Sequence, residues 1–123
     1  GGKKVYADFK GFTHITDQPV KAGGEGTAPP PFDLFLASMG TCAGIYILGF
    51  CQQRGISTEG LELFQSMDFS PISKRFEKIN LEIKLPRDFP EKYQSAVIQA
   101  ANLCAVKKHL ENPPEFNVYT TVD

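Results

Sequence analysis

The sequence predicts an α+β fold in which antiparallel strands pack on one long apolar helix. Between Asp33 and Arg54 there is no charged residue, and the apolar side chains recur at helical spacing. Residues 61–69 and 78–85 instead alternate apolar and polar side chains, which predicts two half-buried strands. With 123 residues, the chain is expected to form a single domain over residues 1–123.

The long helix is expected over residues 31–54. Pro31 suits its first turn, Asp33 complements the positive end of its dipole, and Gly55 follows as the C-cap. Such a helix is about 36 Å long, and its other side is also largely apolar. Because a chain of this size cannot easily surround it, we expect a second copy of the chain to cover it. One stripe consists of Phe32, Phe35, Met39, Cys42, Tyr46 and Phe50.

The remaining elements follow from alternation and from turn residues. Strands are expected at 3–9 and 12–17, with a tight turn at Lys10-Gly11, and the Gly/Pro-rich stretch 23–31 is expected to be a loop. A turn near Ser70-Pro71 joins strands 61–69 and 78–85. A helix is expected to begin near 88–90, with one apolar stripe that extends as far as Cys104. A short helix is expected at 105–110, and a closing strand at 116–122.

Charge and composition argue against several classes of partner. The net charge of −1 does not favour nucleic acid or an anionic membrane surface. The long helix carries polar residues and lacks the aromatic and basic anchors of a membrane span, so no membrane is expected. Without a signal pattern, the expected compartment is the cytoplasm. His14 and His109 lack partners at metal-binding spacing, so no metal site is expected.

The three cysteines are the candidates for chemistry, and their odd number argues against a disulfide framework. Cys42 lies between Gly40 and Gly44, whose small size would give another helix or a substrate close access. Cys104 is expected on the core side, where one helix ends and another begins. A helix N-terminus lowers a thiol's pKa, although buried free cysteines are commonly inert. Cys51 points away from Cys42 and is interpreted as packing.

Three segments carry a resemblance to a known family. PFDLFLASMGTCAGIYILGFCQQRGI, NLCAVKKHL and PPEFNV resemble the OsmC/Ohr family, the osmotically inducible protein C-like and organic hydroperoxide resistance proteins. The shared pattern is Pro-x-(Asp/Glu)-Leu-Phe-x-Ala followed by a cysteine in the central helix, then Cys-x-Val before the last strand. The resemblance extends over nearly the whole chain.

This resemblance implies an intertwined α+β homodimer with the central helices buried together. It implies that Cys42 attacks an organic hydroperoxide and becomes a sulfenic acid, and that Cys104 resolves it as a disulfide. An external dithiol would then reduce that disulfide, without any cofactor.

The sequence departs from the family at two supporting positions. The family's glutamate position is occupied by Phe32, with Asp33 one step later, and no arginine precedes Arg54. Lys10 or Lys21 could supply the positive charge, although lysine does not replace the arginine fork. A substrate site is expected to include Phe32, Asp33, Phe35, Met39, Tyr46 and Lys21. The alternative function is a dimer that binds a small apolar ligand or senses redox state without peroxidase activity.

Overall fold

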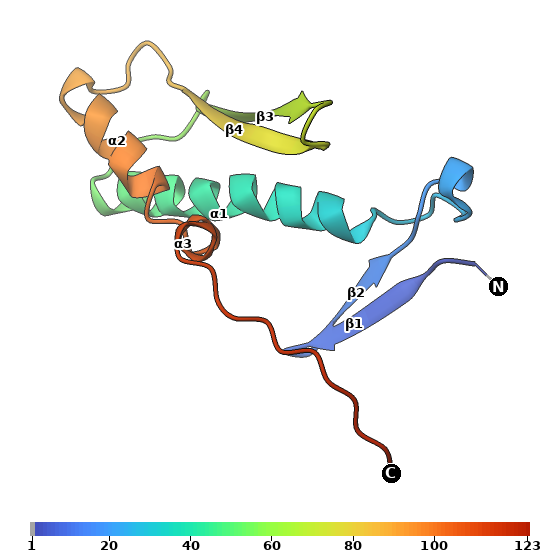
Figure 1. Cartoon of the computed structure of the whole chain (residues 1–123). Helices are drawn as coiled ribbons and strands as arrows, with labels where there is room; N and C mark the ends of the chain where they lie inside the picture. Colours follow the sequence, from blue (N-terminus) through green and yellow to red (C-terminus); the bar gives the residue numbers. More distant parts are fainter. Residues whose placement is uncertain (1) are drawn as a thin grey trace. The chain divides into compact units, whose positions relative to one another are not determined.

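The computed structural model describes residues 2–123 (Figure 1). The chain consists of two compact units, one ending at Ser38 and one beginning at Met39. The elements in order are β1 (Val5–Phe9), β2 (Phe12–Thr16), the 3-10 turn η1 (Val20–Ala22), α1 (Pro31–Gln53), β3 (Glu62–Ser70), β4 (Arg75–Lys84), the 3-10 turn η2 (Glu91–Tyr93), α2 (Gln94–Ala101) and α3 (Ala105–Glu111).

The first unit contains an antiparallel hairpin of β1 and β2, closed by the expected tight turn. Phe9 pairs with Phe12 across a two-residue loop. Lys10 and Gly11 both have positive φ, 52° and 83°, which is the backbone of a type I′ turn. Both predicted strands are therefore confirmed, each slightly shorter than expected.

After β2, the loop that leads to α1 is organised around the buried carboxylate of Asp17. This side chain has no exposed surface. Its oxygens accept hydrogen bonds from the backbone N–H groups of Gln18, Glu25 and Thr27 at 2.7–3.4 Å, and from the Thr27 hydroxyl at 2.8 Å. The backbone and hydroxyl bonds from Thr27 are the main cause that lowers the pKa of Asp17 to about 2. The buried carboxylate thus holds the loop together through hydrogen bonds, which compensate for the loss of its hydration.

The long helix forms as predicted and ends one residue earlier than expected, at Gln53. Gly55 takes the left-handed conformation, with φ 63°. The N–H of Ile56 donates to the carbonyl of Cys51 at 2.9 Å, and the N–H of Gly55 donates to that of Gln52 at 3.3 Å. This pair of bonds is a Schellman ending, which satisfies carbonyls that the helix itself leaves open.

In the second unit, β3 and β4 form an antiparallel hairpin that covers one side of α1 (Figure 1). Leu63 pairs with Ile83 and Gln65 with Leu81, so these side chains share one face of the hairpin. Gly44 on α1 faces Leu63, and a Cβ at Gly40 would lie 2.8 Å from the side-chain oxygen of Gln65. The two glycines therefore bring α1 close to β3, rather than opening the helix to another helix or to a substrate.

The core of this unit lies where α2 and the hairpin meet the C-terminal half of α1. Val97 of α2 has no exposed surface and lies at its centre. The buried members of the cluster are Ala43, Ile47, Phe50, Cys51, Phe89, Val97, Ala100 and Ala101.

Two expectations about the C-terminal third are wrong. The predicted helix to Cys104 is broken into η2, α2 and a bend, so Cys104 lies outside any helix as the N-cap of α3. Residues 116–122 form no strand, because a strand needs a ladder partner and none of the described residues 2–123 pairs with them. Phe116 and Val118 are 87% and 96% exposed there.

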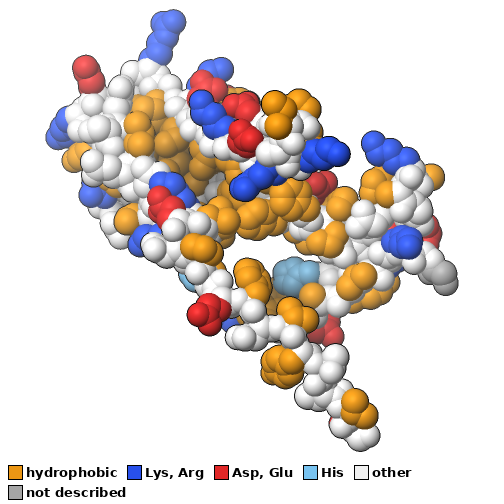
Figure 2. Space-filling view, in the orientation of Figure 1, with side chains coloured by type: hydrophobic (Ala, Val, Ile, Leu, Met, Phe, Trp, Pro, Cys, Tyr) orange, Lys and Arg blue, Asp and Glu red, His pale blue; other side chains and the backbone are white. Residues whose placement is uncertain are grey.

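A single chain leaves much of α1 uncovered. Ile45 is 59% exposed and Tyr46 37%. Figure 2 shows hydrophobic side chains gathered on the surface of the molecule between patches of charge. Among the described residues, α1 is the helix long and apolar enough to cross a membrane, a criterion that the core helix of a soluble protein also meets. The exposure agrees with the expectation that one chain cannot surround this helix.

Candidate active site

The structure brings Cys42 and Cys104 into contact as two free thiols. Cys42 is half-buried in the middle of α1, on the side opposite the two glycines that approach β3. Cys104 is 2% exposed and begins α3. The side-chain interaction between the two thiols lowers the pKa of Cys42 and raises the pKa of Cys104, as expected where the Cys104 thiol is oriented toward the sulfur of Cys42. The expectation that Cys104 faces the core, at the junction of two helices, is confirmed.

The first backbone groups of α3 make Cys42 the more acidic thiol. Burial acts to raise the pKa of Cys42, but the hydrogen bond from Cys104 and the N–H groups of Val106 and Ala105 outweigh it, so the pKa is lowered. These N–H groups belong to a helix start, where they have no partner within the helix. Hydrogen-bond donors therefore stabilise the Cys42 thiolate.

Cys104 is shifted in the opposite direction. Burial raises its pKa, and so does the hydrogen bond that it donates to Cys42, while the N–H groups of Lys107 and Val106 act against them. Of the two thiols, Cys42 is therefore the one that ionises more readily, and Cys104 is the one that keeps its proton. Once Cys42 has ionised, its sulfur is a nucleophile and the neighbouring thiol still holds a proton.

Cys51 takes no part in this pair. It has no exposed surface, it belongs to the core cluster, and burial raises its pKa despite the nearby Arg54. The interpretation of Cys51 as a packing residue agrees with this placement.

The other predicted site residues are divided between the two units. Met39 is buried and Tyr46 is partly exposed in the unit that holds the cysteines. The remaining four lie in the first unit, so their part in a site with Cys42 stays a prediction. Lys21 lies in η1, and Phe32, Asp33 and Phe35 lie in the first two turns of α1, where the two phenylalanine rings are 5.7 Å apart.

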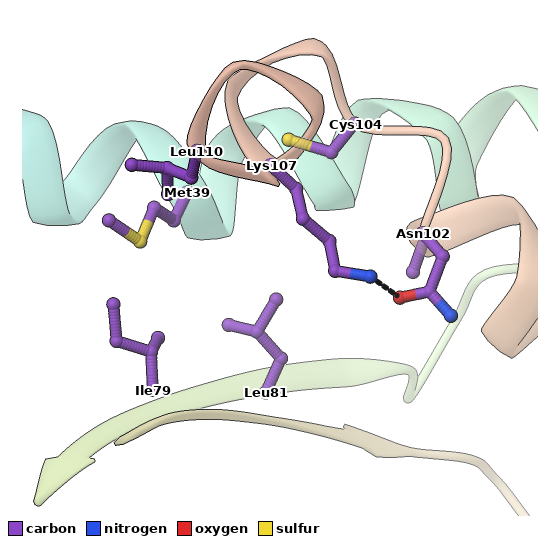
Figure 3. A pocket seen from close by; sticks show the side chains of 8 residues that line it. Met39, Ile79, Leu81, Asn102, Cys104, Lys107 and Leu110 are labelled. Atoms are coloured by element: carbon purple, nitrogen blue, oxygen red, sulfur yellow. Dashed lines mark hydrogen bonds between the residues drawn. The ribbon is translucent and has the colours of Figure 1, made fainter. Parts of the chain in front are cut away.

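A cavity of about 280 Å³ lies beside Cys104, between α3 and the inner face of the β3–β4 hairpin. Figure 3 shows Met39 and Leu110 along one side, Ile79 and Leu81 along another, and Lys107 crossing toward Asn102. The ammonium of Lys107 donates to the side-chain oxygen of Asn102 at 3.0 Å. The wall is otherwise mainly apolar and includes Cys104 but not Cys42.

Comparison with known proteins agrees with the sequence pattern. A sequence model of the family described as OsmC-like protein matches residues 24–119, which include both paired cysteines. The chain belongs to the OsmC-like protein family. No curated protein matches it significantly.

Solved structures show the OsmC-like fold. A Psychrobacter arcticus 273-4 protein assigned to the osmotic stress and detoxification response is 20% identical, with a TM-score of 0.65, over 86% of this chain and 85% of that one. A structural genomics structure is 19% identical, with a TM-score of 0.59, over 92% and 90%. An organic hydroperoxide resistance protein OsmC from Legionella pneumophila is 21% identical over 88% of each chain, with a TM-score of 0.47.

Some functional groups were missed by reasoning from sequence. The N–H groups of Ala105 and Val106 carry no side-chain signal, and only the break before a new helix at Cys104 hinted at them. The place of Lys107 in a cavity wall was also missed, because a lysine in a short helix gives no signal of it in the sequence. Within residues 2–123, no group of three His, Cys, Asp or Glu side chains could hold a metal ion.

Proposed function

We propose that this OsmC-like protein is a thiol-dependent peroxidase that reduces organic hydroperoxides. The observation that carries the proposal is the pairing of two free thiols in which the interaction with Cys104 lowers the pKa of Cys42. A lowered pKa increases the thiolate fraction at neutral pH, and the thiolate is the nucleophile in cysteine chemistry.

The reaction proceeds in three balanced steps. The Cys42 thiolate attacks the terminal oxygen of R–O–OH, the O–O bond breaks, and the products are the Cys42 sulfenic acid and, after protonation, the alcohol R–OH. The Cys104 sulfur then attacks the sulfenic sulfur, forming a Cys42–Cys104 disulfide and releasing water. An external dithiol finally reduces this disulfide and is itself oxidised to a disulfide.

The structure offers a physical basis for activity without the family's arginine. The groups that lower the pKa of Cys42 are the Cys104 thiol and the N–H groups of Val106 and Ala105. Fixed N–H dipoles at a helix start favour a negative charge, as a nearby cation would. We propose that they compensate in part for the missing guanidinium, while Lys10, Lys21 and Asp33 remain candidates to act on the peroxide.

The proposal includes a homodimer in the cytoplasm, with residues 1–123 as its single domain. Its support is the exposed apolar surface of α1 and of residues 116–122, where Tyr119 and Val122 are 80% and 95% exposed. Sedimentation of the purified protein tests the assembly. A monomer at micromolar concentration would contradict it.

The activity is tested by consumption of cumene hydroperoxide in the presence of a dithiol. Cys42→Ser is expected to abolish consumption, because a hydroxyl at this position is not ionised at neutral pH. Cys51→Ala is the matched control and is expected to retain the rate, since Cys51 lies in the core away from the pair. Equal rates for the parent and Cys42→Ser would refute the proposal.

The alternative is a dimer that binds a small apolar ligand or senses redox state. The observation in its favour is the apolar cavity beside Cys104. Ligand binding that survives in a Cys42→Ser, Cys104→Ser double variant, with no peroxidase activity in the parent, would favour this function.

A further inference from the structure

We propose that the hydrogen bond between Lys107 and Asn102 is a clamp that holds the bend around Cys104 against Cys42, which makes both polar residues positioning residues for the thiol pair. The inference rests on the proposed function, because the thiol pair is its reaction centre. It adds a role for two side chains outside the pair.

The clamp closes a short loop that contains the groups acting on Cys42. Asn102 ends α2, Lys107 lies in the first turn of α3, and the ammonium of Lys107 donates to the side-chain oxygen of Asn102 at 3.0 Å (Figure 3). Residues 103–106 lie between them. These residues include Cys104 and the two backbone N–H groups that favour a negative charge on Cys42. A bond between the two ends of the loop therefore restricts all of these groups at once.

The backbone by itself holds this bend loosely. The N–H of Leu103 donates to the carbonyl of Ala100 at 3.1 Å, and the N–H of Cys104 donates to that of Ala101 at 3.4 Å, which is long for such a bond. Cys104 has φ −49° and ψ 126°, so it lies outside both α2 and α3. A side-chain bond across the bend thus adds a constraint that neither helix supplies.

Lys107 has a second partner in Glu111, one turn further along α3. The ammonium lies 3.7 Å from a carboxylate oxygen of Glu111, and both side chains are partly exposed. An exposed ion pair of this kind contributes little to stability, and it lies within α3 without crossing the bend. The bond to Asn102, rather than the ion pair, therefore positions Cys104.

The clamp acts through geometry and not through the charge of Lys107. On α1 there is no charged residue between Asp33 and Arg54, and Tyr46 is the titratable residue one turn after Cys42. The pKa of Cys42 is shifted by burial, by Cys104 and by two backbone N–H groups. The charged or titratable side chains of α3 are not among the causes of this shift: Lys107, Lys108, His109 and Glu111.

The test is the pH dependence of iodoacetamide labelling at Cys42 in the full chain, which reports the pKa of this thiol without any peroxide. Asn102→Ala removes the acceptor and changes no charge. It is expected to raise the pKa of Cys42 by about 0.3–1 unit, up to the equivalent of one hydrogen bond. Lys107→Met removes the donor but keeps a side chain of similar length, and the same shift is expected. Because both changes break one bond, the double variant should shift the pKa no further than either single variant.

Three control variants separate geometry from charge. Lys108→Met removes an exposed neighbouring charge, and Glu111→Gln removes the ion pair, so both should leave the pKa of Cys42 unchanged. Lys107→Arg keeps a donor and should restore most of the parental pKa. A parental pKa in folded Asn102→Ala and Lys107→Met proteins would overturn the proposal. Equal shifts in Lys107→Met and Lys108→Met, or additive shifts for Asn102 and Lys107, would overturn it as well.

Failure of the proposed function is seen separately. If Asn102→Ala raises the pKa of Cys42 but the parent does not consume cumene hydroperoxide, then the clamp stands and the peroxidase assignment does not. If the parent consumes the peroxide and the pKa is the same in Asn102→Ala, then the peroxidase assignment stands and the clamp does not.

Discussion

Replacing Cys104 by alanine is expected to make Cys42 less reactive without unfolding the protein. The change removes the S–H donor that faces the Cys42 sulfur, and it leaves the N–H groups of Ala105 and Val106 in place. One hydrogen bond contributes about 0.5–1.5 kcal/mol net, which corresponds to about two- to thirteenfold in the thiolate population at equilibrium. Because only the thiolate reacts, the alkylation rate at Cys42 should fall, by at most this factor, since a higher pKa also makes the remaining thiolate more nucleophilic.

The assay is the rate of iodoacetamide labelling at Cys42 at pH 7, followed by peptide mass spectrometry. Cys104→Ser is the matched control, since its hydroxyl keeps a donor at the same position and serine is a favourable N-cap for α3. The serine variant should label closer to the parent rate than the alanine variant does. A Cys104→Ala protein that is folded, by circular dichroism, and that labels as fast as the parent would refute the account of Cys42.

Three other predictions concern the core, the Asp17 loop and the order of thiol reactivity. Val97→Ala should lower the free energy of unfolding by about 1.5–3 kcal/mol, because Val97 is fully buried, whereas Ile98→Ala at a 54% exposed site should change it little; urea denaturation measures both. Asp17 has its pKa lowered from 3.8 to about 2, so its stabilising effect is complete well above pH 3.8 and is lost as the pH falls through 2. Asp17→Asn should therefore be less stable at pH 7 and lack this acid dependence in pH-dependent unfolding. At pH 7 Cys42 should be alkylated before Cys51, since their pKa values are shifted in opposite directions, and labelling of Cys51 first would contradict the site.

Local elements were predictable because their signals are local. Pro31, ahead of the uncharged run between Asp33 and Arg54, and the left-handed Gly55 mark the two ends of α1. The alternation of apolar and polar side chains predicted β3 and β4, and the turn residues Lys10-Gly11 predicted the first hairpin. The strand over 116–122 failed because alternation reports only that one face of a segment is apolar, while a strand also needs a neighbour to pair with.

The sequence by itself determined the family, the apolar central helix and the two cysteines worth examining, since these depend on residue identity and spacing along one element. Only the tertiary structure decided that Cys104 meets Cys42, that Gly40 and Gly44 face β3, and that a cavity opens beside one thiol and not the other. Those facts depend on how α3 and the β3–β4 hairpin pack against α1. Packing brings together residues far apart in the chain, and no local pattern records which of them will touch.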